Sequence, residues 1–161
     1  MHNNRNIIKS ISNLDLAIYI SAQLNHFFPD NDKVLSETLL YFIDSVEEKA
    51  IKCFAWIPKK YFRDGNNIYF NHLQSDQYAM YLCILSRYIA ENSNDQNIAT
   101  KLYYLNKSLH SIDIYFRTEL PDIFLFVHPL GSILGRAKFA DYFVMYQGCT
   151  VGCLNDGIFP E

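Results

Sequence analysis

The fold of this chain is indicated most clearly by residues 127–152, which read VHPLGSILGRAKFADYFVMYQGCTVG. Apolar side chains recur in this stretch at every sixth position: Val127, Ile133, Phe139, Met145 and Val151. A fixed short period of this kind is typical of stacked repeats and does not match the 3.6-residue period of an amphipathic helix. The spacing predicts a left-handed parallel β-helix, with these five side chains pointing into a three-sided prism. An ordinary pair of strands with coincidental spacing is the alternative.

Upstream of this stretch, as far as about Asp113, the pattern is helical. Apolar residues recur every three or four positions in about four segments. Asn13 and Asp32 are predicted to cap the first two helices, which Pro29 and Pro58 then end. About four amphipathic helices are enough to bury a small core.

The predicted fold class is therefore α+β. An all-helical N-terminal domain is expected at residues 1–120, and the first coils of the left-handed parallel β-helix at residues 121–161. Between the second and third helices, the turn sequence DGNN at residues 64–67 predicts a short hairpin or an irregular loop.

Composition excludes several classes of protein. The 161 residues are 50% hydrophobic, 16% aromatic and 19% charged, which is too apolar for a disordered chain. A net charge of -3 provides no basic surface for nucleic acid. No run approaches the roughly 20 apolar residues that span a bilayer, and the first residues do not resemble a secretory signal. We expect a cytoplasmic protein without a nucleic-acid or membrane partner.

Four cysteines are too few and too scattered for a disulfide framework: Cys53, Cys83, Cys149 and Cys153. The last two lie four residues apart, but no second pair of cysteine or histidine ligands stands nearby to complete a zinc site. All four are expected to be buried and reduced, and no metal site is expected.

Several motifs resemble those of a known family. Residues 128–137, HPLGSILGRA, resemble the first coil of the serine acetyltransferase group of hexapeptide-repeat acyltransferases. The segments SDQYA at 75–79, LSR at 85–87 and KLYYLNK at 101–107 resemble the last two helices of the domain that precedes the β-helix in that group. The resemblance spans roughly residues 70–152.

The resemblance implies an activity. Serine acetyltransferases transfer an acetyl group from acetyl-CoA to a hydroxyl of L-serine, and a sugar is an alternative acceptor here. Acetyl-CoA would be a co-substrate, with no bound cofactor. A histidine oriented by an aspartate would remove the hydroxyl proton, and backbone donors would stabilise the oxyanion. The resemblance also implies a trimer-based homo-oligomer with active sites at the subunit boundaries.

The catalytic pair of that family is not matched residue by residue. On the six-residue register, the family's catalytic histidine falls on Asp141, the acidic residue before it on Ala140, and the aspartate before His-Pro on Phe126. Asp141 is a candidate base if burial raises its pKa; otherwise it is a solvated or hydrogen-bonded corner residue. His128 is the second catalytic candidate, as a residue that helps to bind substrate, although a histidine fixed by packing is the more common role. It matches the family's His-Pro, and the resemblance implies that this histidine shapes the entry to the β-helix and is not the base. Residues that bind the acetyl-CoA stay unassigned.

Two further acidic residues have structural explanations. Asp76 opens a predicted helix, where a carboxylate favourably faces the helix dipole. Asp113 follows another predicted helix and is interpreted as a residue at its end.

The length suggests an incomplete β-helix. Residues 127–161 supply under two coils of about 18 residues each, whereas roughly three stacked units are needed for stability. The chain is therefore expected to be the N-terminal part, or a truncated copy, of an O-acyltransferase. A non-catalytic module, whose helices mediate assembly or dock a partner enzyme, is the alternative.

Overall fold

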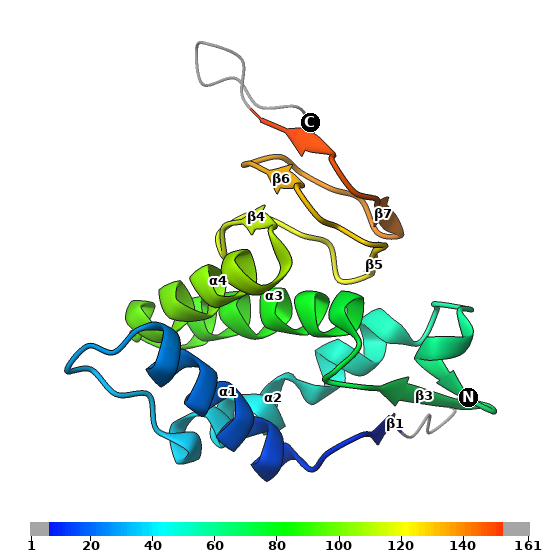
Figure 1. The fold of residues 1–161 in the computed structure, drawn as a ribbon. Coiled ribbons are helices and arrows are strands. Elements are labelled where there is room, and N and C mark those ends of the chain that lie inside the picture. The colour runs from blue at the N-terminus through cyan, green and yellow to red at the C-terminus, as the bar shows by residue number, and fades with distance from the viewer. Residues whose placement is uncertain (1–6, 153–161) are drawn as a thin grey trace.

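Residues 7–152 are described by the computed structural model. In Figure 1, a stack of short strands lies on one side of the helices, and a small separate sheet lies near the N-terminus. The elements are β1 (Ile7–Lys9), α1 (Asn13–Phe27), α2 (Ser36–Phe54), the 3-10 helix η1 (Lys60–Phe62), β2 (Arg63–Asp64), β3 (Asn67–Phe70), α3 (Ser75–Asn92), α4 (Gln96–His110), β4 (Asp113–Ile114), β5 (Phe124–Phe126), β6 (Ile133–Leu134), β7 (Phe143–Met145) and β8 (Thr150–Val151).

The four predicted helices are present, but the N-caps of α1 and α2 differ from those predicted. Ser12, rather than Asn13, caps α1, because its Oγ accepts a first-turn backbone N–H at 3.1 Å. Asp32 does not cap α2, which begins at Ser36. The Asp32 carboxylate instead accepts a hydrogen bond from Asn97, so it links the α1–α2 connection to α4.

The main core lies between the helices. Helix α3 packs against α4, α2 and β5, so it is central in Figure 1. Leu85 and Ile89 of α3 and Leu102 and Leu105 of α4 are completely buried. Fully burying one such side chain stabilises a fold by about 1.5–3 kcal/mol, so this interface is a major source of stability.

A small sheet lies at the N-terminal end, with strand order β1-β3-β2. The antiparallel β2–β3 hairpin forms where the turn sequence predicts it, and Gly65 in this turn has φ of 58°. Strand β1 was not predicted. It pairs in parallel with β3, which lies some sixty residues further along the chain.

The remaining strands form two parallel sheets. One has the order β4-β6-β8, and the other pairs β5 with β7. The chain therefore alternates between the sheets and returns to each after 17 to 20 residues, as in the pairings of Asp113 with Ile133, Ile133 with Thr150, and Phe124 with Phe143. The stack begins with β4, which lies within the segment predicted to belong to the helical domain.

The predicted inward register holds at most positions. The buried or half-buried members are Val127, Phe139, Met145 and Val151. Ile133 is wrongly predicted, because its side chain is 46% exposed while that of Leu134 is only 2% exposed. Since successive side chains of a strand face opposite sides, the register has slipped by one residue at β6. The slip follows the tight turn at Gly131, which the six-residue period does not detect.

The cysteines are only partly as predicted. Cys53 and Cys83 are buried free thiols, and burial raises the pKa of each to about 12. Cys149 is exposed, contrary to the prediction, because it lies in the open turn between β7 and β8. Cys153 lies outside the described residues.

Candidate active site

The first turn of α3 contacts the turn that follows β5. Asp76 lies on α3 and is only 1% exposed, and its Oδ1 accepts a hydrogen bond from the backbone N–H of His128 at 3.2 Å. Its Oδ2 lies 3.8 Å from Nδ1 of His128, whose side chain is 75% exposed. Within residues 7–152, Oδ2 of Asp76 is one of two buried side-chain N or O atoms without a hydrogen-bond partner. A buried carboxylate therefore faces a solvent-accessible imidazole.

Local sequence explains why His128 projects from the surface. Strand β5 and the following Val127 are buried, and the chain then reverses at Pro129. His128 has φ of 48°, a left-handed conformation that is unfavourable for residues other than glycine. It is held there by two backbone contacts, its N–H to Asp76 and its carbonyl to the N–H of Leu130 at 2.8 Å. The turn also hydrogen bonds to the end of α4, because the N–H of Gly131 donates to the Ser111 carbonyl.

This geometry is suited to general base catalysis. A carboxylate near Nδ1 favours the tautomer in which that nitrogen carries the proton. Nε2, on the opposite edge of the His128 ring, then has a free lone pair that can accept a proton. Nucleophilic and acyl-transfer sites use a base and an orienting acid of these residue types, although the 3.8 Å between Nδ1 and Oδ2 here is longer than a hydrogen bond.

A second histidine lies behind this pair. His110 of α4 is buried, and its Nδ1 contacts Oδ1 of Asn106 at 2.7 Å. Burial lowers the pKa of His110 below its ordinary value, although the negative charge of Asp76 opposes this shift. His110 is therefore a neutral, structural neighbour of the carboxylate, while His128 is the histidine that a substrate can reach.

Asp141, the other predicted candidate, lies elsewhere. It is exposed, and its Oδ1 accepts the backbone N–H of Ile123 at 3.1 Å, immediately before β5. His128 follows the other end of β5, and five extended residues span roughly 15 Å. The structure therefore brings His128 to Asp76 and leaves Asp141 at the far end of the strand.

Three other residues discussed from the sequence are Phe126, Ala140 and Asp113. Phe126 is completely buried, and Ala140 is exposed. Asp113 lies on β4 rather than at a helix end, and it accepts hydrogen bonds from Tyr103 and Lys107, both at 2.6 Å. Burial alone would raise the pKa of Asp113, but these two hydrogen bonds lower it.

Sequence reasoning missed the contact between Asp76 and His128. Its position in the first turn of a helix gave it a sufficient explanation, since a carboxylate there stabilises the helix dipole. The one available signal was that SDQYA lies in a segment that resembles the family's helical domain.

Among residues 7–152, no group of three or more histidine, cysteine or acidic side chains is arranged to hold a metal ion. In the same part of the chain, no helix has both the length and the apolar character needed to cross a membrane.

Comparison with known proteins supports the fold. No protein-family profile matches the sequence, and no curated protein matches it in sequence. Among solved structures, the fold is similar to that of a serine acetyltransferase in complex with CoA, with a TM-score of 0.52 and 18% sequence identity. The match covers 85% of this chain and 60% of the other chain, so this chain spans little more than half of that protein. This similarity supports a serine acetyltransferase-like α+β fold for the described residues.

Proposed function

We propose that this chain is an acetyl-CoA-dependent O-acyltransferase similar to serine acetyltransferases, with His128 as its general base. The observation that carries the proposal is the contact between the exposed imidazole of His128 and the buried, otherwise unpartnered Oδ2 of Asp76. The CoA complex of the structural neighbour supports acetyl-CoA as the donor. The acceptor is a hydroxyl compound, either L-serine or a sugar.

The proposed reaction is direct acyl transfer. Nε2 of His128 removes the proton from the acceptor hydroxyl while the oxygen attacks the thioester carbonyl of acetyl-CoA. The tetrahedral intermediate collapses as the carbon–sulfur bond breaks. The departing sulfur then takes the proton from the His128 imidazolium, so that the products are the acetyl ester, CoA and the regenerated base.

Asp76 supports this cycle in two ways. Its Oδ1 holds the backbone of His128 in its left-handed conformation, and its Oδ2 favours the tautomer that leaves Nε2 free. Because Asp76 is buried, its interaction with the imidazole is weakly screened by water and salt.

The proposal extends to architecture. The alternation between two parallel sheets supports the start of a left-handed β-helix at residues 121–161 after a helical domain at 1–120. The outward-facing, exposed Ile133 and Val144 support packing against other copies in a trimer-based assembly. The acetyl-CoA groove would then lie between neighbouring subunits.

The test is a CoA-release assay. The purified 161-residue chain is incubated with acetyl-CoA and either L-serine or a panel of sugars, and the thiol signal from its own four cysteines is subtracted. Acceptor-dependent release is expected. His128→Gln should reduce it by at least about 100-fold, because general base catalysis contributes about 10²–10⁴-fold.

His26→Gln is the matched control, since His26 is also exposed but lies at the end of α1. This variant should retain full activity. Absence of release with every acceptor would overturn the enzyme proposal and favour the non-catalytic assembly module. Equal activity of the His128→Gln and unsubstituted proteins would overturn the assignment of the base.

A further inference from the structure

We infer a second ligand site, for a small organic anion, in the pocket between α2, α3 and residues 120–124. The pocket has a volume of about 400 Å³, within the range of small-molecule sites. Its lining includes the cationic Lys49, Lys52 and Arg87, and the acidic Glu48 and Asp122. Cationic side chains therefore outnumber acidic ones by three to two at this cavity, in a chain whose net charge is -3.

The cationic groups are arranged so that they can still accept a ligand. Arg87 donates from Nε to Glu91 at 2.6 Å and from Nη1 to the carbonyl of Leu120. A guanidinium has five N–H donors, so these contacts leave others for a bound anion. The planar donor set of arginine matches the oxygen atoms of a carboxylate or a phosphate.

Both lysines form ion pairs at the exposed rim of the pocket. Lys52 pairs with Asp122, and both side chains are more than half exposed, at 56% and 62%. Nζ of Lys49 lies 3.9 Å from Oε2 of Glu91, and these side chains are 51% and 44% exposed. The same Nζ lies 5.4 Å from the ring centroid of the half-buried Tyr88. Exposed ion pairs are worth little, so a ligand anion can replace a side-chain carboxylate at small cost.

The interior of the pocket is apolar. Leu120, Phe124 and Cys83 are buried, and Ile84 is half-buried beside them. Burial raises the pKa of the Cys83 thiol to about 12, so this part of the pocket is uncharged at neutral pH. The occupant that fits both features has one anionic group at the rim and a compact apolar body inside.

The anion pocket is separate from His128, but it is lined by Phe124 of β5, the strand that leads to His128. Besides the contact of Arg87 with Leu120, the Cys53 thiol donates to the Phe124 carbonyl at 3.4 Å. These contacts hold the segment that leads into β5, and β5 leads to His128. The inference does not depend on the proposed acyl transfer, because binding is measured without donor or acceptor.

Calorimetry with phenyl phosphate tests the proposal, since this probe combines an anionic group with an apolar ring. It should bind to the full chain. Benzyl alcohol lacks the anionic group and should bind at least about tenfold more weakly, as expected when one charged hydrogen-bonding partner is lost. Inorganic phosphate lacks the ring and should also bind at least about tenfold more weakly, because no apolar surface is buried. The Ile84 methyl resonance should shift on addition of phenyl phosphate.

The double variant Lys49→Gln/Lys52→Gln should weaken binding of phenyl phosphate at least about tenfold. The control Lys33→Gln/Lys138→Gln removes the same charge from exposed lysines that do not line the pocket, and it should bind normally. All four lysines are exposed, so both double variants are expected to fold. Equal weakening in the two variants, equal binding of inorganic phosphate, or an unshifted Ile84 resonance would each overturn the proposal.

Discussion

Oδ2 of Asp76 lies 3.8 Å from Nδ1 of His128, which joins the first turn of α3 to the turn after β5 across 52 positions of sequence. The carboxylate is buried, and the imidazole is exposed to solvent. Burying a carboxylate is costly unless it is paired, so its position beside a reachable histidine requires an explanation. Orientation and stabilisation of His128 provide one.

Asp76→Asn tests this explanation directly. The amide can still accept the backbone N–H of His128, but the substitution removes the carboxylate that favours the tautomer with a free Nε2. Acetyl transfer should fall by roughly 10²–10⁴-fold, as when the orienting acid of a catalytic histidine is lost. Steady-state kinetics measure the loss, and ¹⁵N NMR of the ring should show a changed tautomer population for His128. An unchanged tautomer with full activity would contradict the role given to Asp76.

Asp141→Asn should leave acetyl transfer within about twofold of the unsubstituted chain, because no step of the proposed general base catalysis uses this residue. The reason is structural, since the Asp141 carboxylate is exposed and accepts the N–H of Ile123, which asparagine can also do. The same CoA-release assay measures it. A hundredfold loss of acetyl transfer would contradict this prediction and support Asp141 as the general base.

The register of β6 can be tested by a matched pair of truncations. Leu134→Ala should lower the free energy of unfolding by about 2–5 kcal/mol, because it leaves a cavity in the core. Ile133→Ala should cost less than about 1 kcal/mol, because Ile133 is 46% exposed. Urea denaturation of both variants gives the two values. The reverse order would restore the six-residue register in which Ile133 points inward.

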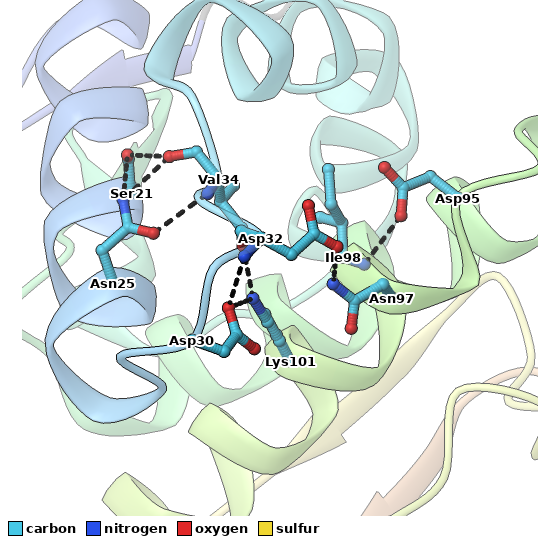
Figure 2. A network of polar contacts seen from close by, with 9 residues as sticks. All are labelled: Ser21, Asn25, Asp30, Asp32, Val34, Asp95, Asn97, Ile98 and Lys101. Carbon is cyan, nitrogen blue, oxygen red and sulfur yellow. Dashed lines mark hydrogen bonds and ion pairs between the residues drawn. The ribbon is translucent and has the colours of Figure 1, made fainter.

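Lys101 connects the α1–α2 loop to α4, as Figure 2 shows. Its ammonium group is buried and donates to Oδ1 of Asp30 at 2.7 Å and to the carbonyl of Asp32 at 2.6 Å. Lys101→Ala should lower the free energy of unfolding by about 2 kcal/mol, through lost charged hydrogen bonds and lost packing. In urea denaturation, the exposed Lys33→Ala should change it by less than about 0.5 kcal/mol. Equal effects of the two substitutions would mean that the network adds no stability.

Stability should depend on the protonation of His110. Burial lowers the pKa of His110 below 6.5 in the folded chain, whereas the unfolded chain binds this proton below about pH 6.5. Unfolding therefore takes up a proton in this range, and the free energy of unfolding should fall as the pH decreases from 6.5 toward the folded pKa. Above pH 6.5, His110 contributes no pH dependence.

His110→Gln isolates this contribution, because glutamine can still donate to Asn106. Urea denaturation at several pH values should give a flatter profile for the variant below about pH 6.5. Burial also lowers the pKa of His72. Because His72 is present in both proteins, its contribution to the pH dependence cancels in the comparison. Parallel profiles would show that His110 does not titrate in this range.

The helices could be predicted from the sequence because the residues that specify them lie close together in the chain. The apolar periodicity of α2, the prolines that follow α1 and α2, and the turn sequence before β3 all act within a few residues. Strand β1 was missed because three residues carry too little pattern, and they become a strand only by pairing with β3.

By itself, then, the sequence determined the four helices, the hairpin, and the change to short parallel strands after α4, since these follow from periodicity and turn residues. It also presented His128 next to proline. Only the tertiary structure decided that Leu134 rather than Ile133 faces inward, and that Asp76 rather than Asp141 meets His128. The first outcome depends on the tight turn at Gly131, and the second depends on how α3 packs against β5. The apolar period detects neither, because a tight turn shifts the register without changing the pattern and a contact between distant segments leaves no motif in the chain.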